Sequence, residues 1–301
     1  MPEPRIGAMS RRPDRATLAG HESGMNEPAP FGSYNPSGLA GWIIERTQSL
    51  PNNWLGRRLY VFLRRIATPL LKRHPLDVER LGARMRLHPY NNICDKKVLF
   101  TPQFFDPDEM ELLKTRVTDG FIFVDVGANI GAYSLFVAAH AGPHARILAI
   151  EPQPDVFDRL VYNIGQNPFG TVKAVACAVA DKAGELTMFV DARNRGESSV
   201  KIVGAGDEDT MQVPAVTLLG LVRQEDFPRI DAIKLDVEGA EDIILEPFFR
   251  DAPETLYPAL VIIEKGGGQW QIDLPALLAR HGYAKLRETR LNLIFERKPG
   301  A

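Results

Sequence analysis

The stretch that decides the fold reads Val124-Asp125-Val126-Gly127-Ala128-Asn129-Ile130-Gly131-Ala132-Tyr133-Ser134. An apolar segment over residues 121–126 leads into it and predicts a buried strand, and an apolar segment over 130–141 predicts the helix that follows. Gly127 and Gly131 permit a tight turn and a close approach of the backbone to a ligand. A strand, a glycine-rich turn and a helix in this order predict the first loop of a Rossmann-like α/β domain.

The residues between the glycines indicate which ligand the loop binds. A dinucleotide-binding loop needs a middle glycine so that its backbone reaches the pyrophosphate, and here that position holds Asn129. Asp125 ends the strand, where a fixed carboxylate repels phosphate but suits the ammonium and sulfonium of S-adenosylmethionine. The sequence therefore favours S-adenosylmethionine over NAD, FAD or ATP. We expect six loop residues to bind this cofactor: Asp125, Gly127, Ala128, Asn129, Gly131 and Tyr133.

Two more acidic residues are candidates for binding the nucleoside. Glu151 follows the second predicted strand, and an acidic residue roughly 20 positions beyond such a loop accepts hydrogen bonds from the ribose hydroxyls. Asp181 follows a third predicted strand over 172–179, where it is placed to accept from the adenine amino group. An ordinary turn aspartate is the equal alternative for Asp181.

From residue 121 onward, apolar strands alternate with helices. Strands without apolar–polar alternation are buried on both faces, so we expect a mostly parallel sheet with helices on both faces. The last two predicted strands, 283–287 and 292–296, are joined by a link too short for a crossover helix, so one of them runs antiparallel. Short extra strands are expected over 185–190 and 212–216. The other predicted strands cover 121–126, 145–150, 172–179, 230–236 and 259–264.

Three segments are expected along the chain. Residues 1–37 are rich in Pro, Gly, Ser and charge and predict a disordered tail. Residues 38–105 predict an N-terminal extension, in which helices precede a β-hairpin with a turn at Asn91-Asn92. Residues 106–301 predict the main domain, with Asp106 capping its first helix.

The helix expected over residues 53–73 carries an apolar stripe with arginines beside it. Packing of the stripe on the main domain, with the arginines in water, is the ordinary pattern of a surface helix and is favoured. The alternative is a basic helix lying on an anionic membrane surface, with Trp54 as an interfacial anchor. The stripe consists of Leu55, Leu59, Phe62, Ile66 and Leu70.

Composition excludes several classes of partner. With 45% hydrophobic residues and a net charge of −2, the chain has no overall field that would capture nucleic acid. Cys94 and Cys177 lie far apart, which argues against a disulfide framework and predicts a reducing, cytoplasmic location. If the basic helix does contact a membrane, that location becomes peripheral, at its inner face. The sequence contains no indication of the oligomeric state.

Four segments together resemble the FkbM-type methyltransferases over roughly residues 95–297. The resemblance implies a Rossmann-like class I methyltransferase domain, a seven-stranded sheet with one antiparallel strand, S-adenosylmethionine as methyl donor, and an oxygen of a natural product or sugar as acceptor. Asp125, Gly127, Asn129, Gly131 and Glu151 match the family's cofactor motifs. The segments are VDVGANIGAYS (124–134), AIEPQPDVFDRL (149–160), AVADKAGE (178–185) and IKLDVEGAE (233–241).

Three carboxylates are expected where the acceptor binds. Asp236 and Glu238 follow one core strand and Glu264 ends the next, and ligands of open α/β sheets bind at these carboxyl ends. Asp236 would orient the donor's ammonium or the acceptor hydroxyl, and Glu238 or Glu264 would be the general base if burial raised its pKa. In the alternative, all three hold a divalent cation such as Mg²⁺, which the spacing alone favours less.

These observations favour an O-methyltransferase acting on a hydroxyl of a small molecule, sugar or glycan. One alternative is a non-catalytic S-adenosylmethionine-binding module that acts in an assembly through its N-terminal helix. Another is an NAD-linked oxidoreductase, against which Asn129 and Asp125 argue.

Overall fold

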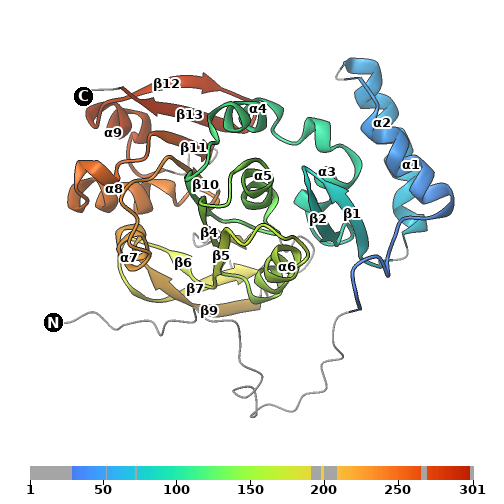
Figure 1. Ribbon diagram of the computed structural model, residues 1–301, viewed down its shortest axis with the longest axis horizontal. Helices are drawn as coiled ribbons and strands as arrows, with labels where there is room; N and C mark the ends of the chain where they lie inside the picture. The colour runs from blue at the N-terminus through green and yellow to red at the C-terminus, as the bar shows by residue number, and fades with distance from the viewer. Residues whose placement is uncertain are drawn as a thin grey trace, which may run out of the picture. The chain divides into compact units, whose positions relative to one another are not determined.

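A computed structural model shows a seven-stranded central sheet (Figure 1). Strand β13 runs antiparallel to both of its neighbours and the remaining pairs are parallel, which confirms the expected sheet. The structure describes residues 29–51, 53–71, 73–190, 198–199, 209–265 and 270–298. Across the sheet the strands are β12 (Tyr283–Glu288), β13 (Asn292–Arg297), β11 (Leu260–Glu264), β10 (Ala232–Leu235), β3 (Ile122–Val126), β4 (Arg146–Ile150) and β5 (Val172–Val175).

Helices cover both faces of this sheet because its strands are apolar on both sides (Figure 1). On β3, Val124 belongs to the core beneath helices α7 to α9, whereas its neighbour Phe123 belongs to the core beneath α4 and α5. Neighbouring residues of one strand thus stabilise opposite layers. These helices are α4 (Pro107–Arg116), α5 (Ala132–His140), α6 (Pro154–Gly165), α7 (Leu218–Gln224), α8 (Glu241–Asp251) and α9 (Leu274–Arg280).

The single strand predicted over 172–179 is wrong, because the chain changes sheets within it. Strand β5 ends at Val175, and β6 (Ala178–Val179) pairs with β9 (Asp209–Val216) in a second, four-stranded sheet. Strand β9 also pairs with β7 (Gly184–Val190), which in turn pairs with β8 (Ser198–Ser199). Small apolar side chains suit either sheet, so the pattern contained no sign of the break.

The N-terminal extension forms two helices, a hairpin and a third helix. The hairpin turns at Leu81-Gly82, where both residues have positive φ angles, and not at Asn91-Asn92 as predicted. Asn92 instead caps α3, since its side-chain oxygen accepts from the N–H of Asp95 at 3.3 Å. The elements are α1 (Gly38–Gln48), α2 (Trp54–Leu70), β1 (Leu76–Arg80), β2 (Ala83–Leu87) and α3 (Ile93–Phe100).

The extension and the main domain share one hydrophobic core, and residues 31–301 form one compact unit. Met85 of the hairpin belongs to the same cluster as Phe123 of the central sheet. Asp77 and Arg86 form a buried ion pair at 2.7 Å, and Asp77 also accepts the backbone N–H groups of Gly32 and Tyr34. Part of the segment expected as a tail is therefore bonded to β1. Its residues 1–28 lie outside the described residues.

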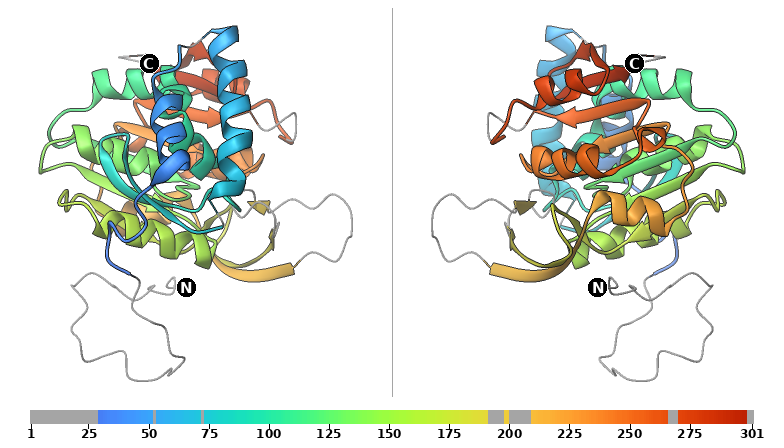
Figure 2. Two further views of the ribbon diagram at one scale, coloured as in Figure 1. Left: turned by 90° about the vertical axis from the view of Figure 1, so that its right-hand side faces the viewer. Right: turned by 90° about the vertical axis from the view of Figure 1, so that its left-hand side faces the viewer.

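Helix α2 does not bury its apolar stripe, so the favoured packing interpretation is wrong. Leu55 is 66% exposed and Phe62 is 61% exposed, whereas Gly56 and Ala67 are the buried residues. A side chain at Gly56 would overlap the backbone of Pro51, so the helix approaches its neighbours through small residues. Figure 2 shows α1 and α2 side by side on the outside of the unit. The stripe Leu55, Leu59, Phe62, Ile66 and Leu70 is exposed along its whole length.

Candidate active site

The glycine loop between β3 and α5 is held by backbone hydrogen bonds and by close contacts with its neighbours. Gly127 has a φ of 76°, and a Cβ there would overlap the backbone oxygen of Asp236. Gly131 has a φ of 90°, and a Cβ there would lie 2.7 Å from the side chain of Leu160. The N–H groups of Gly127 and Ala128 donate to the carbonyl of Ile150 at 3.0 and 2.9 Å. Only glycine permits this conformation and this approach to β10 and α6.

Asn129 joins the loop to two other segments. Its backbone has a φ of 52°, a left-handed conformation that Asn tolerates better than most residues. Its N–H donates to Glu151 at 2.9 Å, and its side-chain oxygen accepts from the amide of Asn92 at 2.8 Å. Sequence reasoning did not find Asn92, because a capping Asn in a turn looks the same whether or not it reaches a distant loop.

Asp125 presents a buried carboxylate oxygen that accepts no hydrogen bond from any described residue. Its Oδ2 accepts from the backbone N–H and the hydroxyl of Ser134, at 3.1 and 2.6 Å, but its Oδ1 has no partner. Burial raises the pKa of this carboxyl, against the opposing effect of Lys234. An orphaned buried oxygen is destabilising by itself, so the site fits a ligand that brings a donor, such as an ammonium.

Glu151 lies at the end of β4 with both carboxylate oxygens held by backbone. Oε1 accepts from the N–H of Gln153 at 3.0 Å and Oε2 from that of Asn129 at 2.9 Å. Each oxygen keeps a lone pair for another donor, such as a ribose hydroxyl. Burial raises the pKa of Glu151 to about 7. The cleft beside it, here called the Glu151 cleft, has an apolar wall that includes Val126, Ile150, Cys177, Val179 and Met188.

The structure does not bring Asp181 together with these residues. Asp181 is exposed and does not line the Glu151 cleft. The reason is that the chain leaves the central sheet after β5. Strand β6 belongs to the second sheet, and Asp181 lies in the turn between β6 and β7. The residues that face the cleft from this part of the chain are Cys177, Ala178 and Val179.

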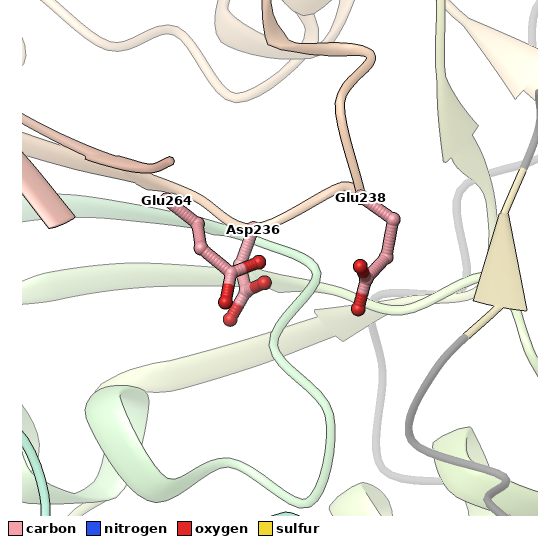
Figure 3. Close-up of side chains that lie close together, drawn as sticks. All are labelled: Asp236, Glu238 and Glu264. Atoms are coloured by element: carbon pink, nitrogen blue, oxygen red, sulfur yellow. The ribbon is translucent and has the colours of Figure 1, made fainter. Parts of the chain in front are cut away.

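A second cleft, here called the Glu264 cleft, adjoins the first and contains the predicted carboxylates. Gly127, Asn129, Asp236 and Glu238 line both clefts. Figure 3 shows the carboxyl groups of Asp236, Glu238 and Glu264 pointing to the same side of the strand ends. Each of the three offers an oxygen, and these oxygens lie within 4.8 Å of one another. The predicted group therefore assembles from the ends of β10 and β11.

A buried lysine neutralises part of this acidic group. Lys234 is 4% exposed, and its Nζ donates to Asp236 at 2.6 Å and lies 4.8 Å from the centre of the Tyr133 ring. Tyr133 donates its hydroxyl to Asp106 at 2.8 Å, so the Asp106 side chain makes no helix cap, contrary to the prediction. Sequence reasoning missed Lys234, although a lysine within an apolar strand was a usable signal, since buried charges are paired.

The carboxyl groups of Asp236 and Glu264 have opposite pKa shifts. Burial, the charge of Asp236 and their mutual hydrogen bond raise the pKa of Glu264 to about 9. Burial also opposes ionisation of Asp236, but Lys234 and the hydrogen bond from Glu264 outweigh it and hold the pKa of Asp236 below its ordinary value. At neutral pH the pair therefore holds one proton, with Glu264 as donor and Asp236 as the ionised acceptor.

The loop that carries Asp236 and Glu238 is held by a third acidic residue. Glu241 is fully buried and accepts the N–H groups of Val237 and Gly239 at 3.2 and 3.3 Å. Its other oxygen accepts the indole N–H of Trp270 at 2.7 Å. These bonds keep Glu238 in a left-handed conformation with a φ of 54°. Glu241 thus positions the carboxylates and does not face the clefts.

The fold and the site together define a class of protein. A seven-stranded Rossmann-like sheet with one antiparallel strand has a glycine loop at its carboxyl edge, between a buried aspartate and an acidic cluster. This is the arrangement of the class I, S-adenosylmethionine-dependent methyltransferases. Residues 125–285 match the model of the methyltransferase FkbM domain, so the chain belongs to the FkbM methyltransferase family. Family membership replaces the hypothesis of an NAD-linked oxidoreductase.

Named relatives are methyltransferases as well. The chain is 34% identical over 222 residues to methyltransferase sdnD of Sordaria araneosa, covering 64% of this chain and 82% of that one. It is 28% identical over 189 residues to hexuronic acid methyltransferase AglP of Haloferax volcanii, covering 62% and 73%. Among solved structures, Aeropyrum pernix fibrillarin in complex with S-adenosyl-L-methionine aligns with a TM-score of 0.40 and 13% identity, covering 63% of this chain and 74% of that one.

Proposed function

We propose that this methyltransferase transfers the methyl group to a hydroxyl oxygen of a sugar or of another small molecule. The observation that carries the proposal is the position of an ionised, lysine-held Asp236 where the Glu151 and Glu264 clefts meet. A small acceptor is also supported by AglP, a relative whose name assigns it a hexuronic acid. The hydroxyl as acceptor is an inference from the carboxylates, which suit an O–H donor.

The residues of the two clefts suit the two ends of S-adenosylmethionine. The apolar wall of the Glu151 cleft suits the adenine, and Glu151 would accept from the ribose hydroxyls. The orphaned Oδ1 of Asp125 would accept from the ammonium of the amino-acid end. The backbone of residues 127–131 would lie against the part of the donor between its adenosine and its amino-acid end. When bound, S-adenosylmethionine supplies an electrophilic methyl group on a sulfonium.

Asp236 is proposed to hold the acceptor hydroxyl and to receive its proton. A carboxylate with a low pKa is a weak base for an alcohol, but the hydroxyl proton becomes strongly acidic as the oxygen forms its bond to carbon. The acceptor oxygen would gain a bond to the methyl carbon as that carbon's bond to the donor sulfur breaks, which leaves a neutral thioether. The acceptor's O–H bond breaks and a new O–H bond forms at Asp236, whose carboxylate is held by Lys234 before the transfer. Most of the acceleration comes from holding the reactants in line.

A divalent cation is a second candidate, supported by the 4.8 Å spread of three carboxylate oxygens. Carboxylates that share a site repel one another unless a proton or a cation lies between them. Asp236, Glu238 and Glu264 would supply three oxygen ligands for Mg²⁺, a cation that keeps several waters. The ion would lower the pKa of an acceptor hydroxyl. In that case Glu264 would bind as the carboxylate and not as the acid.

The proposed function is tested with labelled donor and a panel of sugars. Purified protein is incubated with methyl-labelled S-adenosylmethionine and with hexuronic acids, neutral hexoses and their glycosides, and products are identified by mass spectrometry. We expect a methyl ether on a hexuronic acid or a related sugar. A methyl ester or a methylated nitrogen would contradict the proposal, and donor binding without transfer to any acceptor would favour a non-catalytic module.

The same assay separates the proton from the metal. If Asp236 and Glu264 share a proton, activity remains after treatment with a chelator. Loss of activity that Mg²⁺ restores would assign the three carboxylates to the cation. The matched control is donor binding by calorimetry, which needs no metal in either case.

A further inference from the structure

Helix α2 exposes a continuous apolar stripe on a face that no described residue covers. Its buried side is formed by Gly56 and Ala67, with Leu63 partly buried, and this side packs on the rest of the extension. The stripe of Leu55, Leu59, Phe62, Ile66 and Leu70 lies beside that side and is exposed. An exposed apolar patch of this kind on a folded unit marks an interaction surface.

The residues around the stripe are basic and aromatic. Helix α2 contains four arginines and no acidic residue over its whole length. Trp54 is 67% exposed at its start, with the guanidinium of Arg58 4.3 Å from the centre of its ring. Trp42 of α1 is exposed as well, next to Arg46. The four arginines are Arg57, Arg58, Arg64 and Arg65.

The far end of α2 lies beside the segment that leads into α3. Leu71 and Arg73, just past the helix, line a hollow together with Tyr90 and Lys96. The segment that begins at Tyr90 continues into Asn92 and Cys94, which line the Glu264 cleft. The start of α3 therefore contributes residues to both the hollow at the end of α2 and the Glu264 cleft.

We propose that the stripe and arginines of α2 dock the protein on an anionic lipid bilayer. Apolar side chains on one face, arginines beside them and a tryptophan at one end are the features of a helix that lies in the membrane interface. No helix among the described residues is long and apolar enough to cross a membrane. The proposal goes beyond methyl transfer and stands whether or not the acceptor is a sugar.

Charge favours lipid over a second copy of this chain. In a symmetric pair that joined stripe to stripe, Arg58 and Arg65 of one copy would face the same arginines of the other. Like charges brought together in this way oppose association. Anionic headgroups instead offer an opposite charge to every arginine, and each basic residue near such a surface strengthens binding about fivefold.

The test is sedimentation of the full chain with vesicles, one set purely zwitterionic and one with a quarter of anionic phosphatidylglycerol. We expect binding to the anionic vesicles that salt weakens, with a blue shift of Trp54 fluorescence that Trp54→Phe removes. The double variant Leu55→Ser, Phe62→Ser should lose about tenfold or more in affinity. The double variant Arg58→Gln, Arg65→Gln should lose about fivefold per charge, and only on anionic vesicles.

Controls separate this result from the proposed function. The variant Val161→Ser, Leu286→Ser removes two exposed apolar side chains elsewhere and should bind vesicles like the wild type. Calorimetric binding of S-adenosylmethionine should be the same in all variants, so its loss would indicate a folding defect. Two results would overturn the proposal: vesicle binding unchanged in Leu55→Ser, Phe62→Ser, or a dimer in solution that these substitutions dissociate.

Discussion

The two halves of the candidate site are built in different ways. The glycine-loop half, around Gly127 and Asp125, is one continuous segment held by backbone hydrogen bonds to Ile150 and by glycines that Asp236 and Leu160 approach closely. The carboxylate half is assembled from the ends of β10 and β11, a lysine within β10 and an anchoring bond between Glu241 and Trp270. The first half tolerates little change, because a side chain larger than glycine at 127 or 131 would overlap its neighbours. The second half holds opposed charges whose balance depends on protons or ions.

The largest effect is expected from Gly127→Ala, which tests the glycine-loop half. The new Cβ would overlap the backbone of Asp236 and push the two halves apart. We expect a loss of about 3 kcal/mol in the free energy of unfolding and no measurable donor binding. Gly120→Ala is the matched control, because Gly120 has the same φ of 76° and no atom of the described residues within 4 Å of its Cβ. Equal urea-unfolding curves for the two variants would show that the loop is not held by this contact.

Asp236→Asn tests the carboxylate half. We expect turnover to fall about 100-fold or more, because the amide cannot receive the acceptor proton. The dissociation constant of the donor should change by less than about threefold, as for a group that acts on the reacting hydroxyl and not on the donor. Steady-state kinetics and calorimetry measure the two quantities. Asp251→Asn, an exposed carboxylate at the end of α8, should change neither.

Asp125→Asn distinguishes the ends of the donor. The amide can keep the bonds to Ser134 but no longer offers a charged oxygen to an ammonium, so donor affinity should fall about 30-fold. Binding of methylthioadenosine, which lacks the amino-acid end, should be unchanged. Equal losses for both compounds would place Asp125 elsewhere in the site and weaken the division into halves.

Glu151→Gln should have a smaller effect, since only one of the two acceptor oxygens becomes an NH2 group and the other still accepts hydrogen bonds. We expect affinity for the donor and for its demethylated product to fall about tenfold each, because both carry the ribose. Methionine, which has no ribose, provides the comparison by competition. A loss of the same size for methionine would contradict the role assigned to Glu151.

The smallest effect is expected from Glu264→Gln, measured as stability against pH. The folded protein keeps the proton on Glu264 up to a pKa of about 9, whereas the unfolded chain loses it near 4.5. The stabilisation from this group is therefore complete below pH 4.5 and is lost as the pH rises toward 9. The amide of the Glu264→Gln variant has no proton to lose. Between pH 4.5 and 8 the free energy of unfolding of the variant should therefore rise by about 1 kcal/mol relative to that of the wild type. A higher free energy of unfolding of the wild type when Mg²⁺ is added would instead support a divalent cation bound by the three carboxylates.

The sequence by itself determined the elements and the loop. Glycines at 127 and 131 between a buried strand and a helix, and an acid after the next strand, are local patterns that report burial and turn geometry. Alternating strands and helices with a short last link predicted the sheet with its antiparallel strand, and carboxylates at strand ends predicted the grouping of Asp236, Glu238 and Glu264. That grouping could be predicted because parallel strands end at the same edge of a sheet, so residues that follow neighbouring strands lie close together.

Only the tertiary structure decided several other contacts between distant segments. Because the chain leaves the central sheet after β5, Asp181 does not line the Glu151 cleft. Asn92 of the extension contacts Asn129, and Lys234 contacts Asp236. The tertiary structure also left the stripe of α2 exposed, where the helical pattern predicted packing. The spacing of residues says which face of an element is apolar. What covers that face, and which charge lies opposite, depends on contacts between distant segments that no local pattern records.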